Sequence, residues 1–208
     1  MAQKKKNHHH GDLRAALVKA GVDLMEENGI DGLTLRKCAA RAGVSHAAPA
    51  HHFNGLISLK CAIVAHGHMV FASTMRSEMA LAQPDPVAQL HAVCRGYLIF
   101  SKVHNSLFQL MFQKHQTDFS TITASVLTEL TEHSSQSYGC LQQVCAPFEN
   151  DKDNPNNIEI TVWSLVHGFA VLFGDAKTPT TPTGEPPDFS VILAGLRLTP
   201  KPDIDKNQ

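Results

Sequence analysis

Apolar residues recur at helical spacing along most of the chain. Leu13, Leu17, Ala20 and Leu24 fall three or four residues apart, which gives one apolar stripe on a helix over residues 12–28. Proline, glycine and polar stretches separate this segment from later ones with the same spacing. These later helices are predicted over residues 56–81, 87–103, 106–114, 118–144, 157–173 and 187–198. The pattern predicts an all-α protein with about nine helices in all.

Two of these nine are short helices around a glycine, between the first and the long helix. Thr34 is a good N-cap, because its hydroxyl can accept a hydrogen bond from an amide at the start of the helix. Gly43 can supply the positive φ that ends this helix and turns the chain. Ser45 is predicted to cap the next helix, and Phe53 to close the unit as a core aromatic. This arrangement is typical of a helix-turn-helix, which fits a DNA major groove.

The segment at residues 33–53 resembles the DNA-binding head of TetR-type bacterial transcriptional regulators. HHGDLRAALVKAG, at residues 9–21, is similar to the first helix of one branch of that family. VSHAAPAHHF resembles the recognition helix of this branch, and WSLVHG resembles its C-terminal Trp-x-x-x-His-Gly signature. The resemblance implies a three-helix DNA-binding head with a basic N-terminal arm, residues 1–55. Residues 56–208 would then form a helical ligand-binding and dimerisation domain.

Three residues depart from the family pattern. The family usually has a tyrosine where Ala50 stands and a lysine where Leu56 stands, so two phosphate contacts are lost. Pro49 falls within the predicted recognition helix, near its first turn, where a missing amide costs least. These departures are expected to affect operator affinity more than fold, and Lys60 and the basic arm can compensate.

Position along the two short helices indicates which side chains face DNA. Amides at a helix N-terminus attract phosphate, and basic residues in the first turn can reach the backbone. Small residues at the leading edge can meet base edges, such as a thymine methyl. The candidate DNA-binding residues are Thr34, Arg36, Lys37, Ser45, His46, Ala47, Ala48, His51, His52 and Lys60. The alternatives are that Ser45 is only a cap, that His46 is a solvated surface residue, and that His52 packs within the head.

Charge is unevenly distributed along the chain. Residues 1–60 carry nine Lys and Arg against five Asp and Glu, whereas the remainder carries nine against fourteen. A basic head on an acidic body is typical of a nucleic-acid binder with a separate second function. The basic arm at residues 1–10 either helps to hold phosphates or is a solvated disordered tail.

The body is expected to provide a dimer interface and an effector site. The helix over residues 157–173 is apolar on nearly all sides, so a second copy of the chain is the simplest second cover. With the last helix it would form a four-helix homodimer interface. The candidate ligand-binding residues are Phe108, Met111, Phe112, Trp163 and His167. The alternative is that these residues fill the core, with one hydrogen bond from the Trp163–His167 face.

The sequence therefore predicts a ligand-responsive transcriptional repressor. It would bind a pseudo-palindromic double-stranded DNA operator as a homodimer, and an unknown small-molecule effector would release it. No enzyme is expected, because the sequence has no nucleophile elbow, phosphate loop or HExxH helix. No catalytic residue, metal or cofactor is assigned.

Cysteine usage leaves one alternative of the same fold, a cysteine- or metal-sensing DNA-binding regulator. The five cysteines fit no zinc pattern, and their odd number favours free thiols in a reducing cytoplasm. They are Cys38, Cys61, Cys94, Cys140 and Cys145. No apolar run approaches the ~20 residues of a membrane span, and no secretory signal is recognised. The expected location is the cytoplasm, without a membrane partner.

Overall fold

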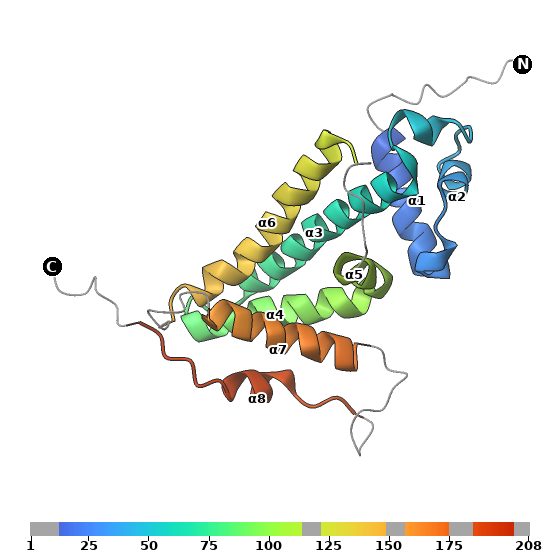
Figure 1. Ribbon diagram of the computed structural model, residues 1–208. Helices are drawn as coiled ribbons and strands as arrows, with labels where there is room; N and C mark the ends of the chain where they lie inside the picture. Colours follow the sequence, from blue (N-terminus) through green and yellow to red (C-terminus); the bar gives the residue numbers. More distant parts are fainter. Residues whose placement is uncertain (1–12, 114–121, 149–156, 175–184, 202–208) are drawn as a thin grey trace, which may run out of the picture. The chain divides into compact units, whose positions relative to one another are not determined.

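The computed structural model describes residues 13–113, 122–148, 157–174 and 185–201, and this part of the chain is built from helices (Figure 1). The predicted all-α class is confirmed. The helices are α1 Leu13–Asn28, η1 Ile30–Gly32, α2 Leu35–Arg41, η2 Ala48–His51, α3 Gly55–Leu81, α4 Pro86–Val103, α5 Asn105–Phe112, α6 Ala124–Cys145, α7 Asn157–Phe173 and α8 Phe189–Ala194, where η denotes a 3-10 helix.

The chain forms two compact units. Unit 1 comprises residues 1–68 and 106–133, and unit 2 comprises residues 69–105 and 134–208. The predicted head therefore lies in one unit with the start of α3, with α5 and with the first part of α6. Helices α3 and α6 each contribute residues to both units.

In unit 1, α1 packs on α2 as its apolar stripe predicts. Leu17, Ala20 and Leu24 are buried on α1, and Cys38 and Ala39 are buried on α2. The three buried residues of α1 belong to the apolar stripe predicted from the sequence, so that stripe is the face that forms the core. Helix α1 thus covers the back of α2.

The turn after α2 also follows the prediction. The Thr34 hydroxyl accepts a hydrogen bond from the Lys37 amide at 3.2 Å, so Thr34 caps α2. Gly43 has φ 70°, a backbone conformation that favours glycine. Phe53 is 2% exposed and anchors the end of the head.

The predicted second helix of the helix-turn-helix is different in the structure. No α-helix begins at Ser45, and the segment instead forms the short 3-10 helix η2, whose N-cap Ala47 makes no side-chain capping bond. The cap predicted for Ser45 is therefore wrong, whereas its contact with DNA remains a prediction. Pro49 explains the change, because its ring disfavours an α conformation at Ala48 and it has no amide for an α-helical hydrogen bond. The amide of Ala50 instead donates to the carbonyl of Ala47, as in a 3-10 turn.

Unit 2 is built around α4. A Cβ placed on Gly96 of α4 would lie 2.7 Å from the Met75 Cα of α3, so the two backbones approach closely there. On the other side α7 packs on α4, with Val162, Val166 and Ala170 buried at four-residue intervals. The predicted bounds of α7 are confirmed.

Three other expectations about helices differ from the structure or lie outside it. The polar sequence at residues 133–139 predicts a kink or frayed turn, but α6 runs unbroken through it, and the Ser137 hydroxyl bonds back to the Ser134 carbonyl. Helix α8 is shorter than predicted, because Gly195 ends it and Arg197 adopts a positive φ of 48°. The sequence also offers Asp12 and Asp118 as helix caps, and both lie outside the described residues.

Helix α3 is long and apolar enough to cross a membrane by length and composition alone. Half of its most apolar stretch is buried inside the protein, and a buried core helix can have the same length and composition.

Candidate DNA-binding surface

Helix α2 presents the first group of predicted DNA-binding residues. Thr34, Arg36 and Lys37 are all exposed, whereas Cys38 and Ala39, next in the chain, are buried. One face of this two-turn helix therefore packs on α1, while the other displays a hydroxyl and two cations. Such a face can hold phosphate through the side chains and through the capped helix end.

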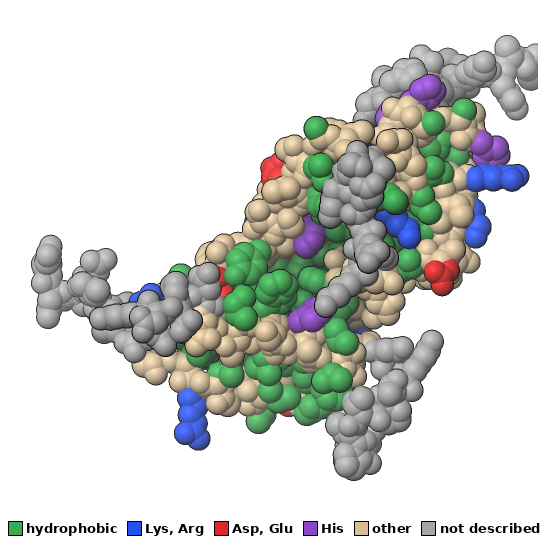
Figure 2. All heavy atoms as spheres, in the orientation of Figure 1, with side chains coloured by type: hydrophobic (Ala, Val, Ile, Leu, Met, Phe, Trp, Pro, Cys, Tyr) green, Lys and Arg blue, Asp and Glu red, His purple; other side chains and the backbone are tan. Residues whose placement is uncertain are grey.

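The segment around η2 presents the second group. Ser45, His46, Ala47 and His51 are exposed. The half-buried members of the predicted set are Ala48, His52 and, in the first turns of α3, Lys60. The His52 ring centroid lies 6.5 Å from that of Phe53, which agrees with the alternative that His52 packs within the head. Figure 2 shows Lys, Arg and His side chains gathered over the edge of the head that carries α2.

Arg14 on α1 is a residue that the sequence analysis missed. Its guanidinium forms a two-pronged ion pair with Glu129 of α6, and its central carbon lies 5.5 Å from the centroid of the Phe53 ring. Phe53 directly follows the η2 segment, so Arg14 links α1, α6 and the end of the candidate DNA-binding surface. The two ion-pair partners are 115 residues apart, so no local pattern could have revealed them.

Replacing Arg14 by methionine is expected to lower the free energy of unfolding by about 1–2 kcal/mol. The half-exposed ion pair contributes up to about 1 kcal/mol, and the cation–π contact a similar amount. Thermal unfolding followed by circular dichroism measures this, with Lys19→Met as the control. Lys19 makes only an exposed pair with Asp23, so its loss should cost less than about 0.5 kcal/mol. Equal losses in both variants would show that Arg14 has no special role.

The predicted effector residues fall into two groups that belong to different units. In unit 1, Phe108 of α5 is buried and its ring centroid lies 4.9 Å from that of Phe112, which is half-buried. Met111 packs on α3, since a Cβ placed on Gly67 would lie 2.6 Å from its sulfur. The Phe112 ring also meets His68, whose pKa is lowered to about 4 by burial and by the nearby His133.

In unit 2, Trp163 and His167 surround a tyrosine that the sequence analysis did not single out. The Tyr97 oxygen lies 2.8 Å from His167 Nδ1. Burial raises the pKa of Tyr97 and lowers that of His167, so both groups are neutral near pH 7. Which of the two groups donates depends on the tautomer of His167. This contact agrees with the alternative that the Trp163–His167 face packs with one hydrogen bond, and a ligand contact there remains a prediction.

Glu159 extends the same face of α7. Glu159, Trp163 and His167 are spaced four residues apart, so they lie in one row along the helix. The Tyr138 hydroxyl of α6 donates to Glu159 Oε2 at 2.9 Å, and its ring meets Trp163 edge-on at 5.8 Å between centroids. Hydrogen bonds with two tyrosines thus hold Glu159 and His167, and the Tyr138 ring packs on Trp163.

All five cysteines are buried and free. Burial raises the pKa of each thiol, to about 12 for Cys145. A raised thiol pKa leaves little thiolate at neutral pH, and thiolate is the form that reacts or binds metal. Among the described residues, no three His, Cys, Asp or Glu side chains are grouped so that they could hold a metal ion.

Solved structures similar to this one include several bacterial regulators. A protein of unknown function from Rhodococcus sp. RHA1 superposes with a TM-score of 0.71 at 22% identity, covering 92% of this chain and 96% of that one. A putative transcriptional regulator of Streptomyces coelicolor A3(2) gives 0.61 at 18%, covering 89% and 96%. The TetR family regulator PfmR of Thermus thermophilus gives 0.55 at 14%, covering 76% and 84%. At these identities the similarity shows a shared fold.

Matches to family models identify the family of the chain, which the solved structures alone do not. No curated protein shows a significant sequence match. The model of the tetR family of bacterial regulatory proteins matches residues 17–55, which hold α1, α2 and η2. The model of the tetracyclin repressor-like C-terminal domain matches residues 90–188. The two matches cover the head and most of the body, in the order that the fold requires. The chain therefore belongs to the TetR family of bacterial transcriptional regulators.

Proposed function

We propose that this protein is a ligand-responsive repressor that binds a pseudo-palindromic double-stranded DNA operator as a homodimer in the bacterial cytoplasm. Residues 1–55 act as the DNA-binding domain, and residues 56–208 act as the ligand-binding and dimerisation domain. A small-molecule effector bound by the body lowers the affinity of the two heads for the operator, so that two sites are coupled through one protein. Regulators of this family are generally not enzymes, and no catalytic role is proposed.

The observation that carries this proposal is the exposed edge formed by α2 and η2. Seven of the ten predicted DNA-binding residues are exposed there, while the residues between them anchor the head: Cys38, Ala39, Pro49 and Phe53 are buried. A rigid edge that combines cations, hydroxyls and small side chains fits a phosphate backbone and the floor of a groove.

Helix α7 supports the homodimer. Val171 and Leu172 are 61% and 57% exposed, and Val191 of the neighbouring α8 is 70% exposed. Figure 2 shows hydrophobic side chains gathered over α7 and α8 on the face in view. A Cβ placed on Gly168 would meet no atom of the described residues within 4 Å, so none of them requires this glycine in mid-helix. Glycine there costs about 1 kcal/mol relative to alanine, and it leaves room for the close approach of a second chain.

For the effector, we propose contacts within each unit taken by itself: Phe108, Met111 and Phe112 of α5 in unit 1, and Trp163 and His167 of α7 in unit 2. Apolar and aromatic side chains with a few fixed polar groups are the usual lining of a small-molecule site. The pair formed by Tyr97 and His167 supplies such a fixed polar group, because each orients the other.

The cysteine- or metal-sensing alternative has less support. Each thiol is buried and has a raised pKa, and the described residues hold no metal-ligand cluster. If mild oxidation abolished DNA binding in the parent but not in a variant with all five cysteines replaced by serine, that alternative would be preferred.

The proposed function is tested by titrating DNA from the region flanking the protein's own gene with the purified protein. Fluorescence anisotropy or a gel-shift assay should show binding that weakens steeply with salt, because Lys and Arg release counterions from phosphate. A double variant, Arg36→Gln with Lys37→Gln, should weaken binding to all sequences alike. The slope of log K against log salt should fall by about 0.9 for each phosphate contact that is lost.

Lys19→Gln is the matched control, since Lys19 is an exposed cation of α1 outside the candidate surface. Its salt slope should equal that of the parent protein. Failure of the parent to bind any duplex at low ionic strength would refute the proposed function.

A further inference from the structure

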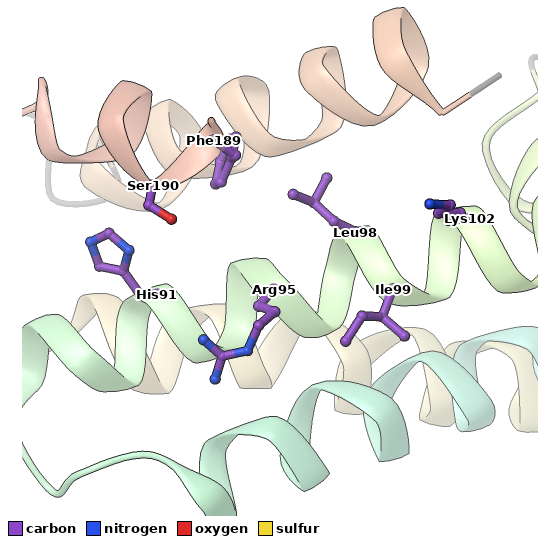
Figure 3. Close-up of a pocket in the computed structure, with 7 residues that line it drawn as sticks. All are labelled: His91, Arg95, Leu98, Ile99, Lys102, Phe189 and Ser190. Carbon is purple, nitrogen blue, oxygen red and sulfur yellow. The ribbon is translucent and has the colours of Figure 1, made fainter. Parts of the chain in front are cut away.

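A groove of about 260 Å³ runs along α4 beside the first turn of α8, within unit 2 (Figure 3). None of its lining residues is acidic, three carry basic side chains, and three are apolar. The lining residues are His91, Arg95, Leu98, Ile99, Lys102, Phe189 and Ser190. None of them belongs to the effector residues expected on α5 and α7.

The basic groups lie on both edges of the groove. Figure 3 shows His91 turned toward Ser190 of α8, whereas the Arg95 guanidinium lies at the opposite edge, toward α3. There its Nε donates to the Glu78 carboxylate, which fixes the plane of the guanidinium. Its two terminal nitrogens have no hydrogen-bond partner among the described residues, and this fork is the end that matches a carboxylate.

Apolar side chains line the stretch from Arg95 to Lys102. Leu98 and Ile99 come from α4: Leu98 points toward Phe189 of α8, whereas Ile99 points to the α3 side, as Arg95 does. The Phe189 ring lies 5.0 Å from that of Phe169 on α7, between centroids, so this wall is held in place. Seven residues of α-helix span about 10 Å, so the apolar stretch is long and narrow.

The volume of the groove limits the size of a ligand that it can hold. Since a water molecule takes up about 30 Å³, the groove has room for roughly nine groups of that size. It is smaller than the pockets that usually hold drug-sized ligands. Its length and its apolar middle favour an unbranched chain, and its basic edges favour an anionic head.

We propose that the groove between α4 and α8 binds a medium-chain carboxylate, with the carboxylate held by Arg95 and His91 and the chain lying over Leu98, Ile99 and Phe189. Lys102, at the far end, adds to the positive field without contacting the head. The site makes such acids candidates for the effector, and that further step alone rests on the proposed function.

Isothermal titration calorimetry on the full-length protein without DNA tests the site, with sodium octanoate as the probe. Acetate carries the charge without the chain, and 1-octanol carries the chain without the charge. Octanoate is expected to bind at least about tenfold more tightly than either, because the site uses both features. Equal affinity for octanoate and octanol would show a merely apolar groove and would overturn the proposal.

Substitutions then locate the site. Arg95→Gln should weaken octanoate binding at least about tenfold, and Ile99→Ser should weaken it while leaving the weak binding of acetate unchanged. Lys102→Gln keeps the Arg95–Glu78 pair and should weaken binding about threefold through the field alone. Arg197→Gln removes an exposed cation of unit 2 outside the groove and should leave the affinity within about twofold of the parent.

Two results would overturn the assignment. The first is unchanged octanoate affinity in both Arg95→Gln and Ile99→Ser, which would place the ligand elsewhere. The second is no octanoate binding together with dissociation of a dimer by Ile99→Glu, which would make the groove an interface between copies of the chain. Neither result would alter DNA binding by the parent protein, so failure of this site is distinguishable from failure of the proposed function.

Discussion

Leu172→Glu is expected to convert the homodimer proposed above to a monomer at micromolar concentration. Leu172 is 57% exposed in the single chain and lies one turn from Gly168 on α7. In a symmetric interface each copy would bury one new carboxylate without a partner, in a largely apolar setting. The cost is about 3 kcal/mol or more, which raises the dimer dissociation constant at least about 100-fold.

The same variant should lose operator binding, because two linked heads bind far more tightly than one. Sedimentation velocity measures the oligomeric state, and anisotropy with operator DNA measures a fall in affinity of about 100-fold or more. Gln143→Glu is the control, since it adds the same charge at an exposed position of α6. A Leu172→Glu protein that remained a dimer would show that α7 is not the interface.

Gly96→Val is expected to lower the free energy of unfolding by about 3 kcal/mol, the upper end of the range for overpacked sites. A Cβ at Gly96 would lie 2.7 Å from the Met75 Cα and 3.1 Å from the Thr74 carbonyl oxygen. These are backbone atoms of α3, so no side-chain rotation can relieve the clash. Helix α4 must move as a body, and it carries Tyr97 and Arg95 with it.

Thermal unfolding measures this effect, and the expected fall in Tm is roughly 6–12 °C for a chain of this size. Gly139→Ala is the matched control, because a Cβ there meets no atom within 4 Å in the interior of α6. It should raise the free energy of unfolding by about 0.5–1 kcal/mol, since alanine favours the helix. A Tm for Gly96→Val within about 2 °C of the parent would contradict the close crossing of α3 and α4.

The candidate DNA-binding surface was predictable to the extent that it depends on local rules. Thr34 was identified as a cap because capping needs only a side-chain oxygen next to the helix start. The same rule failed at Ser45, because Pro49 four residues later prevents the α-helix that Ser45 would have capped. Pro49 disfavours an α-helix here more strongly than its position near the first turn of the predicted helix suggests.

Contacts between segments far apart in the chain could not be predicted from the sequence. Arg14 and Glu129, and Tyr97 and His167, are separated by 115 and 70 residues. A single sequence carries no periodicity that links such positions. The groove on α4 depends in the same way on where α8 returns, so its basic residues had no visible connection to Phe189.

By itself the sequence determined the helical class, the limits of most helices, the capped first helix of the helix-turn-helix and the apolar faces that meet in the core. These follow from spacing, capping and glycine geometry, which act over a few residues. The tertiary structure alone decided that the second helix is a 3-10 turn, which residues pair across helices, and where a groove remains open. Those outcomes depend on how whole helices pack, and packing is set by the summed shape of side chains far apart in the chain.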